Sequence, residues 1–329
     1  MKKSSMLIVA GMVLALTLSS APGAGAADPV LKTFTVTSGP LGGDFYALGG
    51  VIGEVAKSVL PGTTVSVNTG GAVENVLKIE GGKADLGTGM VKLYLESLQG
   101  TGAYAGRPPV KNVQVMMYVT PMPMSFFLVK EDSPFKSIAD IAASKPKIRL
   151  LTSKRGSSPS VASENMLKYY GFDYDAIESW GGSVQYVSYA EASSLIQDGH
   201  ADAFVGPIVS SINELITSVK MRMLPIDPAV LDKLTADGYM SYTLKKGQYY
   251  FVAEDIPHMA ESVILPVGAG LPDDAVYKLT KALCEKPELI RNVHPTYAVF
   301  EPERCPSYIE PQHIHPGALR YYKERGWLR

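Results

Sequence analysis

Short apolar runs alternate with amphipathic stretches along the first part of the chain. Runs rich in β-branched and aromatic residues predict strands, and apolar positions that recur every three to four residues predict helices. The expected elements, in order, are strand 33–37, helix 43–59, strand 64–68, helix 72–80 and strand 84–87. Such a β-α-β-α-β series predicts parallel strands joined by right-handed crossovers, and ligands of open α/β sheets bind beyond the carboxyl ends of the strands.

A second series of the same kind follows two apolar runs, 113–120 and 124–130, which are separated by Pro121-Met-Pro123. The proline pair predicts a change of direction between two strands. The later expected elements are strand 148–152, helix 159–170, strand 184–187, helix 190–197, strand 203–205, strand 261–267 and helix 272–284. The pattern predicts two lobes, with 28–122 and 261–329 in lobe 1 and 123–260 in lobe 2.

The first 27 residues are typical of a secretory signal peptide and are set apart from the fold. Lys2 and Lys3 precede an apolar stretch, 6–18, and small residues near 24–27 suit a cleavage site. The stretch is too short for a comfortable membrane span. We therefore expect a mature protein outside the cytoplasm, in the periplasm.

The composition indicates that any binding of a charged partner depends on local groups of residues rather than on the net charge of the chain. The chain is 46% hydrophobic and 19% charged, with a formal net charge of −1, so no overall field favours nucleic acid or an anionic membrane. We expect no nucleic-acid partner, no cofactor and a monomer. Cys284 and Cys305 are the only cysteines, and whether they form a disulfide stays open. No other cysteine or histidine falls at a zinc-site spacing around them, so no metal site is expected.

Two glycine-rich corners join the early strands to the helices, at 38–43 and 68–75. Glycines let backbone N–H groups approach a ligand, and a helix start presents unpaired donors with a partial positive charge. Gly42 and Gly43 expose such donors in the first corner, and Thr69 is expected to cap the helix in the second. A tight turn would explain either corner alone. Two such corners at the same sheet edge instead indicate half of an anion-binding site.

A third corner, 153–160, is expected to supply the other half of that site. Ser158 suits the N-cap and Pro159 the first helical position. One helix terminus contributes roughly 0.3–1 kcal/mol to an anion, whereas micromolar binding needs about 8 kcal/mol, so several donors must converge. Arg155 is the preferred partner for a ligand carboxylate. Tyr118 ends a strand at the predicted lobe crossing and is a candidate contact to both lobes.

Five segments also carry a family resemblance: 37–46, Gly70-Gly-Ala-Val-Glu-Asn75, Gly82-Lys-Ala-Asp-Leu-Gly87, Ala201-Asp-Ala-Phe204 and His315-Pro-Gly-Ala-Leu-Arg-Tyr-Tyr322. In their order and spacing they resemble the TAXI family of TRAP transporter solute receptors, over nearly all of the mature chain. The resemblance implies a type II periplasmic binding-protein fold, with two α/β lobes around a ligand cleft. It also implies capture of a glutamate-like amino acid or another organic anion for the membrane permease subunits of a TRAP transporter.

The resemblance assigns binding roles where its motifs stand intact. The residues concerned are Gly42, Gly43, Tyr46, Gly71, Ala72 and Asn75, with Gly156 and Ser157 in the third corner. Family members often have Gly-Ser-Gly-Thr there, whereas this chain has Gly156-Ser-Ser-Pro159, so Ser158 or Ser160 would have to supply the missing hydroxyl. The identity of the carboxylate ligand therefore stays open.

Other functional classes fit the sequence less well. An exported hydrolase would be expected to show a Gly-x-Ser-x-Gly elbow or a His-Glu-x-x-His helix, and the sequence has neither. An exported enzyme or a sensory ligand-binding protein that acts on a small anion stays an alternative. We expect a receptor rather than an enzyme.

Overall fold

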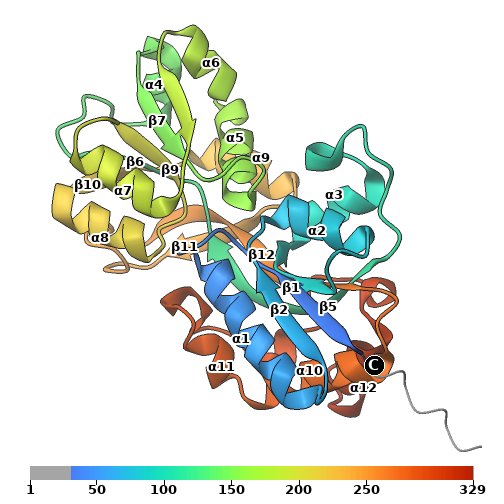
Figure 1. The fold of residues 1–329 in the computed structure, drawn as a ribbon. Coiled ribbons are helices and arrows are strands. Elements are labelled where there is room, and N and C mark those ends of the chain that lie inside the picture. The colour runs from blue at the N-terminus through green and yellow to red at the C-terminus, as the bar shows by residue number, and fades with distance from the viewer. Residues whose placement is uncertain (1–30, 329) are drawn as a thin grey trace, which may run out of the picture.

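The computed structural model describes residues 31–328 and has two lobes, one above the other in Figure 1. The expected signal peptide, 1–27, lies outside the described residues. Lobe 1 is built on a seven-stranded sheet and lobe 2 on a five-stranded sheet. Within the described range, no helix is long and apolar enough to cross a membrane.

The sheet of lobe 1 begins with the expected series of parallel strands. Its strands are β1 (Thr33–Thr37), β2 (Thr64–Asn68), β3 (Leu86–Gly87), β4 (Gly89–Met90), β5 (Val113–Pro123), β11 (Met240–Leu244) and β12 (Ile256–Gly268). β1 pairs in parallel with both β2 and β3. The predicted parallel arrangement is therefore confirmed, and β1 and β2 have the predicted bounds.

Six helices accompany this sheet. They are α1 (Asp44–Val59), α2 (Ala72–Glu80), α3 (Val91–Gln99), α10 (Asp273–Glu285), α11 (Glu288–Arg291) and α12 (Pro316–Glu324). α1 buries one stripe, made of Leu48, Ile52, Val55 and Ala56, as the helical period requires. α1 contacts β2 on one side and α10 on the other, which fixes its first turn at the end of β1.

Lobe 2 repeats the α/β plan. Its elements are β6 (Phe126–Lys130), α4 (Ile138–Ser144), β7 (Arg149–Thr152), α5 (Ser158–Tyr169), α6 (Tyr174–Ser179), β8 (Ser183–Tyr186), α7 (Tyr189–Gln197), β9 (Ala203–Gly206), α8 (Ser210–Val219), β10 (Met221–Leu224) and α9 (Pro228–Ala236). β7 pairs in parallel with β8 and β9, whereas β6 runs antiparallel to β9 and β10. The carboxyl ends of β7, β8 and β9 therefore meet at one edge.

The chain does not turn at the proline pair, so that prediction was wrong. β5 continues through Pro121 and Pro123 and pairs along its length with β12. Proline is tolerated on a strand edge, where its missing N–H removes no ladder bond. The reversal falls instead beyond the prolines, where Ser125 has a φ of 62°.

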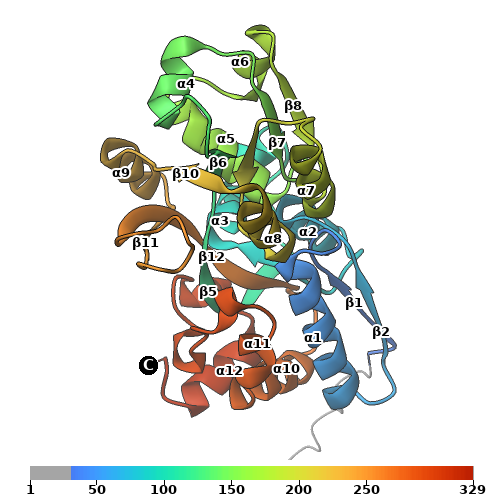
Figure 2. The ribbon, with the colours of Figure 1, turned by 90° about the vertical axis from the view of Figure 1, so that its left-hand side faces the viewer.

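The hairpin of β11 and β12 connects the lobes a second time. β11 pairs with β12 in the sheet of lobe 1. The loop between the two strands packs on lobe 2, because the Tyr249 ring lies 5.5 Å from that of Phe126 and the Tyr250 hydroxyl donates to the Met221 carbonyl. Figure 2 shows this hairpin beside both lobes. The predicted lobe limits at 122, 260 and 261 stay a prediction.

The two cysteines lie next to each other in lobe 1. The sulfur atoms of Cys284 and Cys305 are 3.7 Å apart, and both thiols are buried and free. Burial, followed by contact with Cys284, raises the pKa of the Cys305 thiol well above its usual range. The pair is close enough for a small adjustment to bring the sulfur atoms into bonding distance.

Glu261 is a buried carboxyl group on β12, opposite Met122 of β5. It is 3% exposed, and its Oε2 atom has no hydrogen-bond partner among residues 31–328. Burial raises the pKa of Glu261 to about 8, an effect that Lys92 opposes and Glu96 supports. The folded protein therefore holds this carboxyl group neutral around pH 7.

Refolding in a glutathione redox buffer is expected to join Cys284 to Cys305. The bond would close a short loop, because Cys305 follows Cys284 by 21 positions, and it would stabilise the oxidised form by about 3 kcal/mol through loss of unfolded-chain entropy. Thiol titration in denaturant, followed by denaturant unfolding with and without reductant, measures both effects. Cys284→Ser is the control that removes the difference. Two reactive thiols in the oxidised sample would contradict the prediction.

Glu261→Gln is expected to stabilise the protein at alkaline pH. The unfolded carboxyl group loses its proton near pH 4.5 and the folded one near pH 8, so the unfolding free energy of the wild type falls across this window. The slope is up to about 1.4 kcal/mol per pH unit. Urea unfolding at several pH values should show the two proteins diverging as pH rises, whereas the exposed control Glu54→Gln should follow the wild type. Parallel curves for Glu261→Gln would refute the assignment.

Candidate ligand-binding site between the lobes

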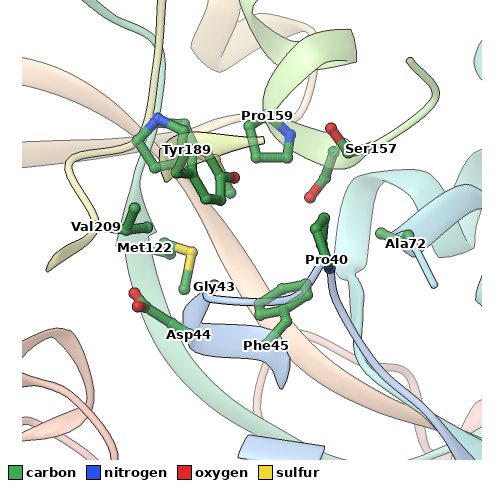
Figure 3. A pocket seen from close by; sticks show the side chains of 14 residues that line it. Pro40, Gly43, Asp44, Phe45, Ala72, Met122, Ser157, Pro159, Tyr189 and Val209 are labelled. Atoms are coloured by element: carbon green, nitrogen blue, oxygen red, sulfur yellow. The ribbon is translucent and has the colours of Figure 1, made fainter. Parts of the chain in front are cut away.

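A pocket lies between the two lobes, where the carboxyl ends of their parallel strands face one another. Its empty space is about 410 Å³, including the part open to solvent. Figure 3 shows the side chains that line it. The lining residues are Pro40, Gly43, Asp44, Phe45, Gly71, Ala72, Met122, Met124, Ser157, Ser158, Pro159, Tyr189, Pro207 and Val209.

The parallel strands place most of this lining. In lobe 1, Gly43 follows β1 and Gly71 follows β2. In lobe 2, Ser157 follows β7, Tyr189 follows β8 and Pro207 follows β9. The position agrees with the rule that open α/β sheets bind ligands beyond the carboxyl ends of their strands, here with two sheets facing each other.

Four helices begin at the pocket without a side-chain cap from the described residues. Gly43 is the N-cap of α1, Gly71 of α2, Ser157 of α5 and Val209 of α8. The first N–H groups of a helix have no partner within it, and they carry a partial positive charge. Several sets of backbone donors therefore lie beside the pocket.

Helices that begin elsewhere in lobe 2 include capped ones. Ser137 accepts from the Asp140 N–H at the start of α4, in a reciprocal capping box, and Asp173 accepts from the Ala176 N–H at the start of α6. Ser157 has a hydroxyl suited to the same task, but it makes no such bond. The uncapped start of α5 is thus not a consequence of its residue type.

The Ser157 hydroxyl is buried and has no partner in the part of the chain that the structure describes. The residue is 4% exposed, lines the pocket, and its Oγ atom makes no hydrogen bond there. Burial of an unpartnered hydroxyl costs about 1–3 kcal/mol. An occupant that accepts from this group and from the N–H groups of α2 and α5 would remove that cost.

Asp44 places a carboxyl group in the pocket from the first turn of α1. Its Oδ2 atom lies 3.3 Å from the Nδ1 atom of His294. Burial raises the pKa of Asp44, and His294 opposes that rise. Thr296 also donates its N–H to the same Nδ1 atom, at 3.3 Å.

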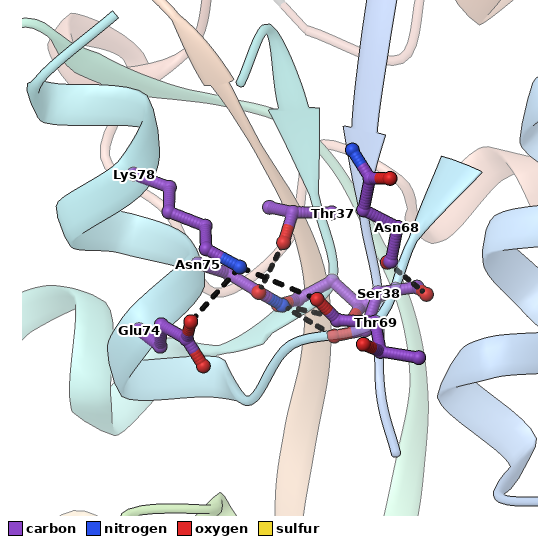
Figure 4. A network of polar contacts seen from close by, with 8 residues as sticks. Thr37, Ser38, Asn68, Thr69, Glu74, Asn75 and Lys78 are labelled. Atoms are coloured by element: carbon purple, nitrogen blue, oxygen red, sulfur yellow. Dashed lines mark hydrogen bonds and ion pairs between the residues drawn. The ribbon is translucent and has the colours of Figure 1, made fainter. Parts of the chain in front are cut away.

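Asn75 does not line the pocket but ties together the loops behind it (Figure 4). Its Oδ1 atom accepts from the Thr37 hydroxyl at 2.8 Å, and its Nδ2 atom donates to the carbonyls of Ser38 and Thr88, both at 2.8 Å. The side chain is fully buried. Its polar atoms are used within lobe 1, so it positions the two glycine corners against each other.

The glycines of the second corner allow two close approaches. A β-carbon at Gly70 would lie 2.1 Å from the Asn75 Oδ1 atom, so glycine is required by the network of Figure 4. A β-carbon at Gly71 would lie 3.7 Å from the Gly156 carbonyl oxygen of lobe 2. These contacts within the protein explain why two glycines are adjacent here. From the sequence alone, the glycines are interpreted as room for the close approach of a ligand.

The helix starts differ slightly from the predicted ones. Gly71, and not Thr69, is the N-cap of α2, so the predicted Thr69 cap was wrong. α5 begins one residue earlier than expected, with Ser157 as the N-cap and Pro159 second in the helix. The earlier start places Ser157 at the pocket.

The structure brings some of the predicted site residues together and leaves others apart. The members that line the pocket are Gly43, Gly71, Ala72, Ser157 and Ser158. The members outside the lining are Gly42, Tyr46, Asn75, Tyr118, Arg155 and Gly156. Gly42 forms the turn before α1 with a φ of 80°, and Gly156 faces Gly71 across the lobes.

Arg155 and Tyr118 lie away from the pocket lining. The Arg155 guanidinium is exposed and lies over the Tyr186 ring, 3.9 Å from its centroid. Such a cation–π contact holds the charge on the surface of lobe 2. Tyr118 is buried in β5 with its ring 4.7 Å from that of Tyr308, and burial raises the pKa of its hydroxyl.

The sequence did not mark the apolar part of the lining as a site. Met122 and Met124 come from the crossing segment, Tyr189 begins α7, and Phe45 follows Asp44 in α1. Only its place in the sequence could have marked Tyr189 as a pocket residue, because it follows a predicted strand of lobe 2. Across residues 31–328, no group of three or more His, Cys, Asp or Glu side chains could hold a metal ion.

Comparisons with known proteins agree with this geometry. The model of the NMT1-like family matches residues 36–326. The solved periplasmic binding protein BugD is 15% identical, with a TM-score of 0.54 over 90% of this chain and 95% of its own. MatC from Rhodopseudomonas palustris, solved with bound malate, is 17% identical, with a TM-score of 0.53 over 91% and 98%. The binding-protein component of an ABC phosphonate transporter from Pseudomonas aeruginosa is 11% identical, with a TM-score of 0.52 over 84% and 82%.

These structural matches confirm the predicted fold class. The chain has the type II fold of periplasmic binding proteins, a mixed α/β architecture with two sheets. At these identities the matches show the fold alone, and the pocket described above is a property of this chain's own residues.

Gly71→Val is expected to hold the lobes apart. The φ of Gly71 is −160°, an extended conformation open to any residue, so the effect is steric. A β-carbon alone meets lobe 2 at 3.7 Å, whereas the methyl groups of valine would overlap Gly156 or Ser157. Small-angle X-ray scattering should give a larger radius of gyration for Gly71→Val than for the wild type or Gly71→Ala. Gly270→Val, at a position with open space around it, is the control. Equal scattering from all variants would contradict the contact.

Proposed function

The chain belongs to the NMT1-like family, and on that premise we propose that it is an extracytoplasmic solute receptor that captures a small carboxylate between its lobes. The observation that carries the proposal is the convergence of four uncapped helix starts on one pocket that also holds the unpartnered Ser157 hydroxyl. A carboxylate accepts several hydrogen bonds at once and suits the partial positive charge of helix N-termini.

The donor set is large enough for useful affinity. One helix terminus contributes roughly 0.3–1 kcal/mol, and a hydrogen bond to a charged group contributes about 1.5–3 kcal/mol. Micromolar binding needs about 8 kcal/mol, which several such contacts supply together. The affinity therefore does not require Arg155, whose guanidinium lies over Tyr186.

Capture couples binding to closure of the lobes. The α2 donors belong to lobe 1 and the α5 donors to lobe 2, and Gly71 lies against Gly156 where the lobes meet. A ligand that accepts from both sets binds the closed form better and shifts the population towards it. The Ser157 hydroxyl has no base beside it among the described residues, which supports capture rather than catalysis.

The motifs that resemble the TAXI family support a partner as well. We propose that the closed form delivers its ligand to the membrane permease subunits of a TRAP transporter, from the periplasm and as a monomer. A glutamate-like amino acid and other organic anions are the proposed ligands. The malate bound to MatC shows that this fold holds a carboxylate in another protein.

Ser157→Ala is expected to weaken ligand binding by about tenfold or more, because it removes a hydrogen bond to a charged group. The free energy of unfolding without ligand should stay equal or rise slightly, since the lost hydroxyl had no partner. Isothermal titration calorimetry with glutamate, malate, succinate and isocaproate measures affinity, and urea unfolding measures stability.

Ser163→Ala is the matched control on the same helix. Ser163 is buried, and its hydroxyl donates to that of Ser125, so this variant should lose stability but keep its ligand affinity. Failure of the wild type to bind any carboxylate in the panel would overturn the proposed function. Unchanged affinity in Ser157→Ala would remove Ser157 from the site.

A further inference from the structure

The pocket has backbone donors but no cationic side chain in its lining. Of the residues that the structure describes, none that lines the pocket is lysine or arginine. The ionisable carboxyl group there belongs to Asp44. A carboxylate ligand therefore meets uncharged donors and one acidic side chain.

His294 lies beside Asp44 and does not line the pocket. Its Nδ1 atom accepts the Thr296 N–H at 3.3 Å and lies 3.0 Å from the Thr296 hydroxyl. Tyr189, Tyr249 and Tyr297 also interact electrostatically with Asp44, and none of them is cationic.

Asp44 and Ser157 stand on opposite sides of the pocket in Figure 3. Phe45, Met122 and Tyr189 lie between them in that view. An occupant whose carboxylate accepts from Ser157 and the starts of α2 and α5 would lay an apolar body across these side chains. Its far end would then face Asp44.

We infer that the pocket selects monocarboxylates with an apolar body and that Asp44 is the residue that excludes a second carboxylate. This inference rests on the proposed function and narrows its ligand class from glutamate-like amino acids and other organic anions to monocarboxylates, so it excludes glutamate itself. Two like charges brought together in a buried site repel each other strongly, because little water separates them. An apolar end brings no like charge to Asp44 and gains contact with Met122 and Val209.

Succinate and isocaproate form a matched pair for the test, because an isopropyl group replaces one carboxylate at nearly the same size. Calorimetry at pH 7 with the full mature chain is expected to show isocaproate binding at least about tenfold more tightly than succinate. Succinamate, in which a neutral amide replaces the second carboxylate, should also bind more tightly than succinate.

Asp44→Asn tests the role of the side chain. It should reduce the ratio of isocaproate to succinate affinity by about tenfold, since the repulsion is removed while the shape is kept. Asp273→Asn is the matched control, because Asp273 is also the first residue of a helix, α10, and does not line the pocket. That control should leave the ratio unchanged.

The outcomes separate the two proposals. Succinate binding as tightly as isocaproate in the wild type would overturn the present inference and leave the proposed function standing. Binding of neither acid, nor of any other carboxylate, would overturn the proposed function and the inference with it. An unchanged ratio in folded Asp44→Asn would remove the role of Asp44. Should that variant fail to fold, the wild-type comparison of succinate, succinamate and isocaproate still decides the matter.

Discussion

The first turns of four helices, α1, α2, α5 and α8, impose the main constraint on this molecule, because all four begin at one pocket without a side-chain cap from residues 31–328. Parallel strands that end at the same sheet edge bring helix starts together, and the fold sets two such edges face to face. In neither lobe does a described side chain cap these helix starts. The cleft is therefore where the polar requirements of both lobes can be met by one anion.

The second requirement is that the lobes come close enough for one small ligand to reach both donor sets. Gly71 meets this requirement at the contact with Gly156, and Gly70 lets Asn75 pull the two corners of lobe 1 together. Asn75 is thus important to the site although it does not line it. Asn75, which holds the loops, and Gly71 and Ala72, which line the pocket, are separated by only a few positions in the sequence.

Much of the fold could be predicted from the sequence, but less of the candidate site could be. Regular apolar periods predicted β1, α1, β2 and α2 nearly to the residue, because these elements form around local patterns. Pro121 and Pro123 led to a wrong prediction of a turn. The strand continues through them because it pairs with β12, which is distant in the sequence. Gly71 and Ser157 were accessible from corner motifs, whereas Met122, Tyr189 and the surface position of Arg155 depend on how the two lobes meet. No local sequence pattern predicts how the two lobes pack against each other.

In the proposed function, dipoles from both lobes hold the anion, and this arrangement has a built-in route for release. A buried arginine on one lobe would keep its charge beside the ligand whether the cleft were open or closed. Backbone donors on α2 and α5 belong to different lobes, so opening the cleft separates them and leaves the ligand with only one set. Affinity then depends on closure itself, and any partner that favours the open form lowers the affinity by the differential contact energy of the two states. The absence of lysine and arginine from the described lining therefore suits the proposed receptor, which would have to release its ligand to a partner.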